Sequence, residues 1–474
     1  MTRLVVIGGG AAGMSAASAA RRVAPEAEVI VCEAGGFAAY GMCGIPYYLG
    51  GVVPDATDLL AYPPAEFRDR RRIDLRLRTR VSAIDARAHQ VHITGEDGPL
   101  SYDALVVATG AGPVRPPVPG LDGPRVFTVR SLDEAIGLRQ LLAAGTVRRA
   151  IVLGAGYIGL EAAEALVCAG AEVEVVEALP RVLGNVDEPI AGLAQAELER
   201  HAALRLGCRL DEVREQAPGG GLTAMVAGTR IDADLVVVAA GVRPATALLT
   251  RAGADHRPDG SVLVDASMRT SLPGVFAAGD CAALHHLVLG APAWVPLGPA
   301  ANKTGRVAGT VAAGGTATFG GIVGTAVVKV FNLEVARTGL TLAEAHAAGL
   351  AAAATDVVSR SRAKYYPGAQ PVHVRLVHAP DGRLLGGQVA GREGAAKRID
   401  VLATALHAGL TVTDLAGLDL SYAPPFAPVY DPVLAAAMKA AQSLDGAAAE
   451  GAAPAAQPVH DAARPAPSPV GGSQ

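Results

Sequence analysis

The segment AAYGMCGIPYYLGG at residues 38–51 places one cysteine, Cys43, among glycines and tyrosines. An enzyme that works through an internal disulfide keeps a second cysteine close by, but the next one in this chain is Cys168. Cys43 is therefore either an inert core residue or a lone reactive thiol that pairs with a thiol from outside the chain. Pro46 is compatible with the first turn of a helix after Cys43, and the start of a helix stabilises a thiolate.

Two glycine-rich segments have the spacing of dinucleotide-binding loops. RLVVIGGGAAG at 3–13 and AIVLGAGYIG at 150–159 each contain an apolar run that leads into glycines and a helical pattern. Glycines at this spacing allow a tight turn and a close approach to a pyrophosphate, which the free N–H groups of the helix bind. One such motif is weak evidence, whereas two in one chain are strong. The glycines are Gly8, Gly10 and Gly13 in the first segment and Gly154, Gly156 and Gly159 in the second.

Each glycine segment is followed by an apolar run that ends in an acid, Glu33 in EVIVCE and Glu177 in EVEVVE. A carboxylate at this position accepts hydrogen bonds from the ribose hydroxyls of a dinucleotide. Glu177 would also repel a 2′-phosphate, which favours NADH, although Arg181 lies nearby and leaves NADPH as the alternative. Two dinucleotide sites in one chain indicate FAD together with NAD(P)H.

The two motifs belong to an internal repeat. Further apolar runs close each unit at residues 104–110 and 235–241, so the fold class is α/β with two Rossmann-like, doubly wound domains. From about Gly321 the pattern becomes that of an α+β domain, with PDG at 380–382 as a hairpin turn. We expect an FAD-binding domain at 1–112 and 242–320, an NAD(P)H-binding domain at 113–241, the α+β domain at 321–443 and a disordered tail rich in alanine and proline at 444–474.

Composition narrows the function classes. A net charge of −4 over 474 residues gives no electrostatic case for binding nucleic acid or an anionic membrane surface. No apolar run reaches the ~18 residues that a transmembrane helix needs. The five cysteines lack the spacing of a disulfide framework or a zinc site, so we expect no metal and a reducing, cytoplasmic setting.

Three more segments add to the pattern: TGAGP at 109–113, GVFAAGDCA at 274–282 and LGPAANKTGR at 297–306. With these, the chain resembles the single-cysteine branch of the pyridine nucleotide-disulfide oxidoreductases over about residues 2–440. That branch contains coenzyme A-disulfide reductases, persulfide reductases, NADH oxidases and NADH peroxidases.

The resemblance implies roles for particular residues. It places Cys43 beside the flavin as the redox cysteine, and it makes the α+β domain a dimerisation domain, so that the enzyme is a homodimer. The flavin contacts that it implies are Thr109, Gly110, Asp280 and Ala300, and the nicotinamide contacts are Glu161 and Tyr157, the latter as a gate.

Other positions indicate which members of this branch the chain resembles. NADH oxidases and peroxidases of the family carry a histidine in the first glycine motif, where this chain has Ala11 and Ala12. Coenzyme A-disulfide reductases carry two tyrosines that reach the partner subunit's active site, in YYPG and YAPP segments. Both segments are present here, and they supply Tyr365 or Tyr366 and Tyr422.

Arg21 and Arg22 resemble the arginines that bind coenzyme A phosphates, with a solvated helix end as the alternative. Met42 stands where relatives often keep an asparagine, and a thioether cannot donate the hydrogen bond that an amide gives. The sequence therefore predicts the class of reaction more firmly than the identity of the thiol that pairs with Cys43.

The predicted reaction passes a hydride from NADH to FAD and then electrons to a mixed disulfide at Cys43. The substrate would be coenzyme A disulfide or a related small disulfide or persulfide. One alternative is an NADH oxidase in which Cys43 cycles through a sulfenic acid. The other is a flavoprotein reductase that passes electrons to a protein partner, with Cys43 incidental.

Overall fold

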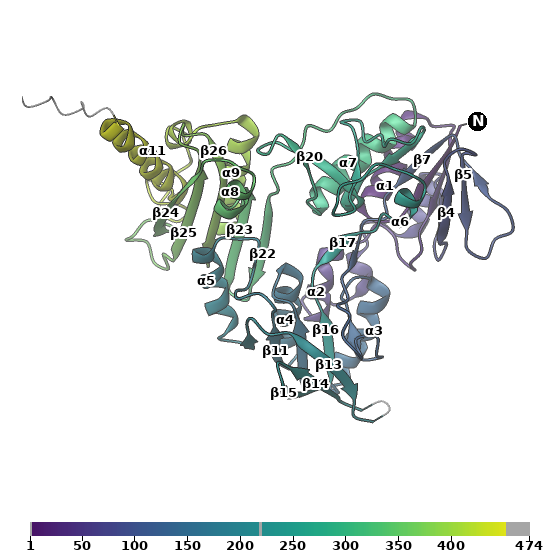
Figure 1. The fold of residues 1–474 in the computed structure, drawn as a ribbon, viewed down its shortest axis with the longest axis horizontal. Coiled ribbons are helices and arrows are strands. Elements are labelled where there is room, and N and C mark those ends of the chain that lie inside the picture. Colours follow the sequence, from purple (N-terminus) through teal and green to yellow (C-terminus); the bar gives the residue numbers. More distant parts are fainter. Residues whose placement is uncertain (1, 218–219, 452–474) are drawn as a thin grey trace, which may run out of the picture.

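The computed structural model describes residues 2–217 and 220–451. Figure 1 shows three bodies. The right-hand body joins N-terminal elements to elements from the middle of the chain, the lower body carries the second repeat, and the left-hand body carries the C-terminal elements. Within the described residues, no helix is both long enough and apolar enough to span a bilayer.

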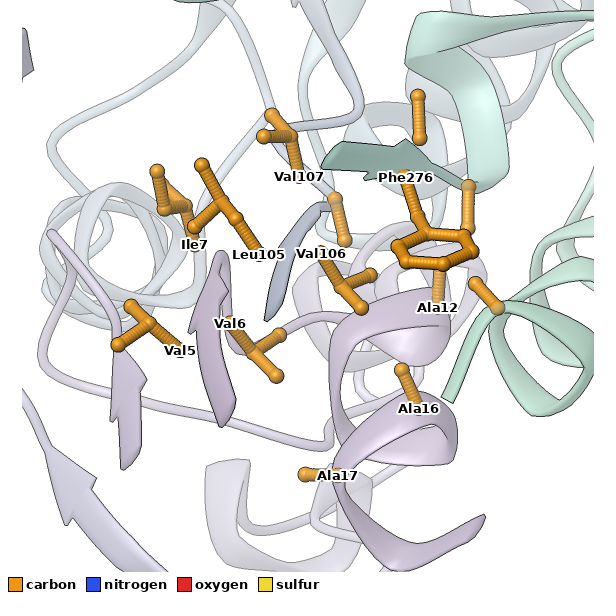
Figure 2. Packing of buried hydrophobic residues seen from close by; sticks show 14 of the residues in the cluster. Val5, Val6, Ile7, Ala12, Ala16, Ala17, Leu105, Val106, Val107 and Phe276 are labelled. Carbon is orange, nitrogen blue, oxygen red and sulfur yellow. The ribbon is translucent and has the colours of Figure 1, made fainter. Parts of the chain in front are cut away.

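The right-hand body is built on a five-stranded parallel sheet in the order β19-β7-β1-β2-β3. Two helices, α1 and α7, pack on each other beside it. Figure 2 shows Val5, Val6 and Ile7 of β1 beside the apolar side chains of β7, α1 and Phe276 of β19. The elements are β1 (Arg3–Ile7), α1 (Ala11–Val23), β2 (Glu28–Cys32), β3 (Asp74–Arg76), β7 (Ala104–Val107), β19 (Val275–Ala277) and α7 (Gly298–Ala312).

The lower body repeats this arrangement with a parallel sheet in the order β12-β11-β10-β16-β9. Its elements are β9 (Val126–Phe127), α3 (Leu132–Ala143), β10 (Arg149–Leu153), α4 (Tyr157–Cys168), β11 (Glu172–Val176), α5 (Glu188–Leu198), β12 (Ala203–Arg205) and β16 (Leu235–Val238). The two parallel sheets confirm the predicted pair of doubly wound units.

Each unit also carries a three-stranded antiparallel sheet before its last parallel strand. The strands are β4 (Val81–Asp85), β5 (Gln90–Ile93) and β6 (Leu100–Ser101) in one unit, and β13 (Leu210–Glu215), β14 (Leu222–Val226) and β15 (Thr229–Ala233) in the other. The chain crosses between the units through β8 (Ala111–Pro113) and returns through β17 (Val242–Pro244), and these two strands pair antiparallel. Shorter elements near the crossing are α2 (Ile45–Leu49), α6 (Ala247–Arg251), β18 (Val262–Leu263), β20 (Ala282–His286) and β21 (Ala291–Ala293).

The left-hand body holds an antiparallel sheet in the order β22-β23-β26-β25-β24. The strands are β22 (Ala326–Val330), β23 (Leu333–Gly339), β24 (Ala353–Arg360), β25 (Pro371–His378) and β26 (Leu384–Gly391), and the helices are α8 (Leu342–Ala347), α9 (Ala395–Ala408), α10 (Val412–Ala416) and α11 (Pro432–Gly451). The pairing of β25 with β26 confirms the hairpin predicted from PDG. Helix α11 runs through the predicted start of the tail, and residues 452–474 lie outside the described residues.

Candidate active site

The first glycine loop is shaped by close backbone contacts. Gly8 has a φ of +104°, and a Cβ added there would lie 2.3 Å from the carbonyl oxygen of Ala108 at the end of β7. A Cβ on Gly13 would lie 1.8 Å from the Gly8 oxygen. Both positions therefore require glycine. Gly10 precedes α1 and faces the terminal methyl of Met42, 3.4 Å from the position of an added Cβ.

The second loop has the same geometry. Gly154 has a φ of +106° and would bring a Cβ to 2.3 Å from the oxygen of Ala239, while a Cβ on Gly159 would lie 2.0 Å from the Gly154 oxygen. A Cβ on Gly156 would meet no atom within 4 Å. Gly156 thus borders open space at the start of α4, where the helix N–H groups would face an anion. A side chain there would occupy the space that a pyrophosphate needs.

The two acids are held in matching positions. Glu33 accepts hydrogen bonds from the N–H groups of Gly9 and Gly35, each at 2.6 Å. Glu177 accepts from Ala155 N–H at 2.6 Å and Leu179 N–H at 2.8 Å. Each carboxylate is thereby fixed against its glycine loop, and each oxygen keeps a lone pair for a ribose hydroxyl.

Asp280 lies in a short helical turn, Gly279–Cys281, that follows β19. Burial raises the pKa of Asp280, and Arg130 opposes that rise. Among the described residues no side chain or N–H donates a hydrogen bond to its carboxylate. A half-buried acceptor without a donor fits the flavin contact that the resemblance implies for this position, since a carboxylate there can accept a hydrogen bond from a hydroxyl of the cofactor.

The remaining predicted flavin contacts differ in their hydrogen bonding, backbone conformation and burial. The Thr109 hydroxyl donates to the Ala245 oxygen at 2.6 Å, which ties the two crossing segments together. Gly110 has a φ of +68°, and Ala300 is buried in the first turn of α7. The side chain of Thr109 therefore has a structural partner already, while its backbone still borders the loop.

Cys43 lies in a 3-10 turn, Met42–Gly44, directly before α2. The residue as a whole is exposed while its sulfur is partly surrounded by protein, and no described cysteine forms a disulfide with it. Desolvation by the surrounding protein raises the pKa of Cys43, and the carboxylates of Glu161 and Asp280 raise it further. The sequence-based expectation that a helix start favours the thiolate stays a prediction: α2 has only five residues, and the charges of Glu161 and Asp280 act against ionisation of Cys43.

Arg130 is a site residue that the sequence reasoning missed. Its Nη1 donates to the sulfur of Met42 at 2.8 Å, and its Nε donates to the Ala111 oxygen at 2.8 Å. Its own N–H donates to Glu134 at 3.2 Å, in the first turn of α3. The helix-start pattern SLDE after Arg130 would have predicted a fixed backbone there, but not its contact with Met42.

Glu161 and Tyr157 come from the first turns of α4. Burial, with a smaller effect from Glu164, raises the pKa of Glu161 to about 7. Tyr157 is half-buried, and desolvation raises the pKa of its phenol, against the opposing effects of Arg337 and Asn185. Desolvation raises the pKa of the Tyr47 phenol on α2, and the Glu161 carboxylate raises it further. A titratable carboxyl of α4 thus acts electrostatically on Cys43.

A basic cleft of about 520 Å³ opens beside the last turn of α1. The hydrogen bonds of Arg21 are already made within the protein, because its guanidinium donates to the backbone oxygens of Pro25, Ala27, Arg71 and Arg72. Arg22 is exposed and forms no hydrogen bond with the described residues. The cleft is lined by Ser18, Arg21, Arg22, Pro25, Tyr62, Arg70, Arg71 and Arg72.

The three candidate tyrosines belong to segments between β24 and β25 and between α10 and α11, in the left-hand body, which Figure 1 shows apart from α2. The hydroxyls of Tyr365 and Tyr422 are 3.3 Å apart, and this contact is the first cause of a raised pKa for Tyr422. Tyr365 is 74% exposed and Tyr422 46%. Tyr366 is exposed beside them, with the Arg362 guanidinium 5.6 Å from its ring centroid.

Two family models match the chain. Residues 2–313 match the pyridine nucleotide-disulphide oxidoreductase model, and residues 325–432 match the dimerisation domain of the same family. The chain belongs to the pyridine nucleotide-disulphide oxidoreductases. Members of this family are FAD-dependent NAD(P)H oxidoreductases, and the chain is an enzyme of that class.

Relatives of the chain fall into more than one branch of the family. The NAD(P)H sulfur oxidoreductase (CoA-dependent) of Pyrococcus furiosus is 37% identical over 90% of this chain and 96% of its own length. The NAD-dependent persulfide reductase of A. fulgidus is 39% identical with a TM-score of 0.90, over 94% of this chain and 84% of that one. A water-forming NADH oxidase from Lactobacillus brevis is 30% identical with a TM-score of 0.89, over 94% of this chain and 100% of that one.

Proposed function

We propose that the enzyme uses NADH to reduce a small disulfide or persulfide, with coenzyme A disulfide as the preferred chemical class. The observation that carries this proposal is Cys43. It is an exposed residue whose thiol lies within the electrostatic influence of Asp280 from the first dinucleotide unit and Glu161 from the second, and no other described cysteine pairs with it. A thiol so placed forms its disulfide with a substrate.

In the proposed cycle the Cys43 thiolate attacks one sulfur of the substrate disulfide. A bond forms between Cys43 and that sulfur, the substrate bond breaks, and the first thiol leaves with a proton. Bound FAD would accept a hydride from NADH and supply two electrons to the mixed disulfide. These electrons break the bond to Cys43, so that a second thiol leaves and the Cys43 thiolate returns. In sum, NADH, one proton and one disulfide give NAD⁺ and two thiols.

The protein's residues support the cofactors in this cycle. Gly8, Gly13 and Glu33 form the cradle for the FAD pyrophosphate and ribose, and the free acceptor on Asp280 suits a ribityl hydroxyl. Gly156 borders the space for the nicotinamide cofactor's pyrophosphate. The fixed carboxylate of Glu177 would repel a 2′-phosphate, which supports NADH over NADPH.

The basic cleft supports a substrate that carries phosphates. Coenzyme A has a pyrophosphate and a 3′-phosphate, and Arg22 is the arginine of the cleft without a partner among the described residues. Arg21, by contrast, is held by four carbonyl oxygens and would shape the cleft more than bind the ligand. The name of the Pyrococcus furiosus relative, which states a dependence on CoA, agrees with this choice.

We infer that the enzyme is a homodimer whose tyrosines serve the opposite subunit. Exposed apolar side chains lie near the Tyr365–Tyr422 pair in sequence, and together with the pair they are here called the aromatic face. Its two segments are tied together because Arg398 donates to the oxygens of Ser361 and Phe426. A phenol beside a departing thiolate would donate its proton. The aromatic face consists of Val358, Tyr365, Tyr366, Tyr422, Phe426, Val429 and Tyr430.

The test is to incubate the FAD-loaded protein with coenzyme A disulfide and to weigh the peptide that contains Cys43. The proposal predicts the mass of one coenzyme A on Cys43 and its loss after NADH is added. A Cys43 peptide that stays unmodified while NADH is consumed would contradict it. Cys168, which is also exposed, serves as the internal control for nonspecific disulfide exchange.

An NADH oxidase is the second candidate, favoured by the similarity to the Lactobacillus brevis enzyme. Ala11 and Ala12 leave the first glycine loop without the histidine that the oxidase branch carries, which argues against it. Oxygen uptake at the rate of disulfide turnover would favour the oxidase. A protein-acceptor reductase would instead keep full reduction of its protein acceptor in Cys43→Ala.

A further inference from the structure

A small cavity lies where the dimerisation domain meets the segment that follows Cys43. It measures about 20 Å³, which is the room of about one water molecule, so little solvent separates the side chains around it. Its walls come from α2 with the loop that follows, from α4 and from β22. Three separate parts of the chain thus share this cavity.

Titratable side chains gather in the cavity from all three elements. Strands β10 and β11 also pack on α4, but their charged residues, Arg149, Glu172 and Glu174, line no part of it. The charge of Glu161 acts on Cys43 as well, so the cavity connects the surroundings of the thiol to the dimerisation domain. The titratable lining residues are Tyr47 of α2, Glu161, Glu164 and Cys168 of α4, and Lys329 of β22.

The dimerisation domain holds both oxygens of Glu164. One oxygen pairs with the Lys329 ammonium, and the other accepts a hydrogen bond from the Phe331 N–H at 2.7 Å, directly after β22. The Glu164 side chain is 16% exposed and the Lys329 side chain 51%. Lys329 therefore brings a positive charge to a largely buried carboxylate, and it is the cationic residue among those that line the cavity.

Glu164 and Glu161 are neighbours on one face of α4, because they are three residues apart in a helix. A negative charge on Glu164 disfavours a second one on Glu161. Burial raises the pKa of Glu161 to about 7, and Glu164 adds a smaller effect in the same direction. An unpaired Glu164 would repel that second charge more strongly, so the ion pair with Lys329 limits the repulsion.

We propose that Lys329 is a positioning residue of the active site, which neutralises Glu164 and thereby lets Glu161 carry its charge beside Cys43 at neutral pH. The inference rests on the proposed function, in which Cys43 is the reacting thiol. Lys329 belongs to the dimerisation domain, whereas Cys43 belongs to the first dinucleotide unit. The packing of β22 on α4 therefore contributes to the reactivity of a thiol in another part of the molecule.

The test locates the pH at which Glu161 ionises, through alkylation of Cys43 by iodoacetamide in the FAD-loaded protein. The rate for Glu161→Gln is divided by the rate with Glu161 present, and mass spectrometry follows the Cys43 peptide. This ratio rises with pH as Glu161 ionises, because the carboxylate slows the thiol and the amide does not. We expect a midpoint near pH 7 with Lys329 present, and a midpoint roughly 0.5–1 pH unit higher in Lys329→Gln.

Three further variants separate charge from structure. Lys329→Arg keeps the positive charge and should keep the midpoint near its wild-type value. Lys397→Gln is the matched control, because Lys397 lies on α9 of the same domain and pairs with Asp400 at 3.1 Å, away from the cavity lining. It should leave the midpoint unchanged. In the Glu164→Gln background, Lys329→Gln should shift the midpoint by much less than in the wild-type background.

A midpoint that is unchanged or lower in Lys329→Gln, or a ratio that does not change with pH in the wild-type background, would overturn the inference. An equal shift in Lys397→Gln or Lys329→Arg would also overturn it, and so would a full shift without the Glu164 charge. Alkylation requires neither NADH nor a disulfide, so these outcomes do not depend on turnover. If coenzyme A disulfide leaves no coenzyme A on Cys43 of the wild-type protein, the proposed function fails, whereas the midpoints still decide the role of Lys329.

Discussion

At the scale of single residues, the environment of Cys43 opposes its ionisation. Desolvation is the first cause, followed by the carboxylates of Glu161 and Asp280. Glu161 is itself titratable near neutrality, because burial raises its pKa to about 7. The two groups are therefore linked: protonation of Glu161 removes a negative charge that disfavours the thiolate. The site can change the reactivity of its sulfur over the physiological pH range.

This linkage predicts the effect of Glu161→Gln on thiol reactivity. As the pH rises through about 7, the wild-type carboxyl ionises and raises the free energy of the Cys43 thiolate. The amide cannot ionise, so the rate of Cys43 alkylation by iodoacetamide should reach its midpoint at a lower pH. The measurement follows the Cys43 peptide by mass spectrometry, with the exposed Glu188→Gln as control. A midpoint that is unchanged or moves upward would contradict the linkage.

Arg22 gives the second prediction at this scale. Reversal of its charge in Arg22→Glu should raise the KM for coenzyme A disulfide by about tenfold, which corresponds to roughly 1.4 kcal/mol of lost binding. Pantethine, the disulfide of the coenzyme A arm without its adenosine phosphates, should keep its wild-type KM, and so should NADH. An equal loss for both disulfides would show that the basic cleft does not bind the phosphates.

At the scale of elements, the two strand–loop–helix units are near copies. Gly8 and Gly154 have φ values of +104° and +106°. In both cases an added Cβ would lie 2.3 Å from the carbonyl oxygen of the residue that follows the neighbouring strand, β7 or β16. This part of the fold follows from local sequence, because glycine spacing and apolar runs fix the loop and its strands together. Arg130 and Arg337 do not follow in this way. Their partners Met42 and Asn185 lie 88 and 152 residues away in sequence.

The second loop offers a matched pair of variants. Gly154→Ala forces a Cβ onto the Ala239 oxygen in a left-handed conformation, which should cost roughly 2–5 kcal/mol of unfolding free energy. Gly156→Ala has open space and should cost less than about 1 kcal/mol. Chemical denaturation measures both. Gly156→Ala should nevertheless weaken NADH binding, because its methyl occupies the space of the pyrophosphate.

The opposite pattern would refute this description of the loop. If Gly156→Ala binds NADH as tightly as wild type, the pyrophosphate does not lie beside Gly156. If Gly154→Ala is as stable as wild type, the close approach to β16's continuation at Ala239 is not a constraint on the fold.

At the scale of the whole molecule, the lower body and the dimerisation domain meet through buried charges. Asp187 at the start of α5 pairs with Arg375 of β25 at 2.9 Å and accepts from Gln388 at 2.7 Å. Lone charges in this position would be costly, so the NAD(P)H-binding unit and the dimerisation domain are held in register. None of these pairs is visible in the local sequence, since each joins residues far apart in the chain. The match of residues 325–432 to a dimerisation domain indicates that two copies of the chain also assemble with each other.

The aromatic face predicts how that assembly can be disrupted. Phe426 is 79% exposed, and Phe426→Asp would bury a carboxylate in the proposed interface, raising the dimer dissociation constant by at least about tenfold. Val327→Asp is the control, because Val327 is exposed on β22 at the opposite edge of the same sheet. Analytical ultracentrifugation measures the assembly. Disulfide reduction should fall in proportion to the monomer fraction, and a fully active monomer would contradict service of the opposite subunit by Tyr365 and Tyr422.

The most direct test of the central claim is the rate of NADH-dependent reduction of coenzyme A disulfide by Cys43→Ser. The hydroxyl keeps the size of the side chain but cannot form the mixed disulfide, while the glycine loops and their acids stay intact. The account predicts that NADH still reduces the flavin and that disulfide reduction falls to the background rate. Retention of the full wild-type rate in Cys43→Ser would contradict it.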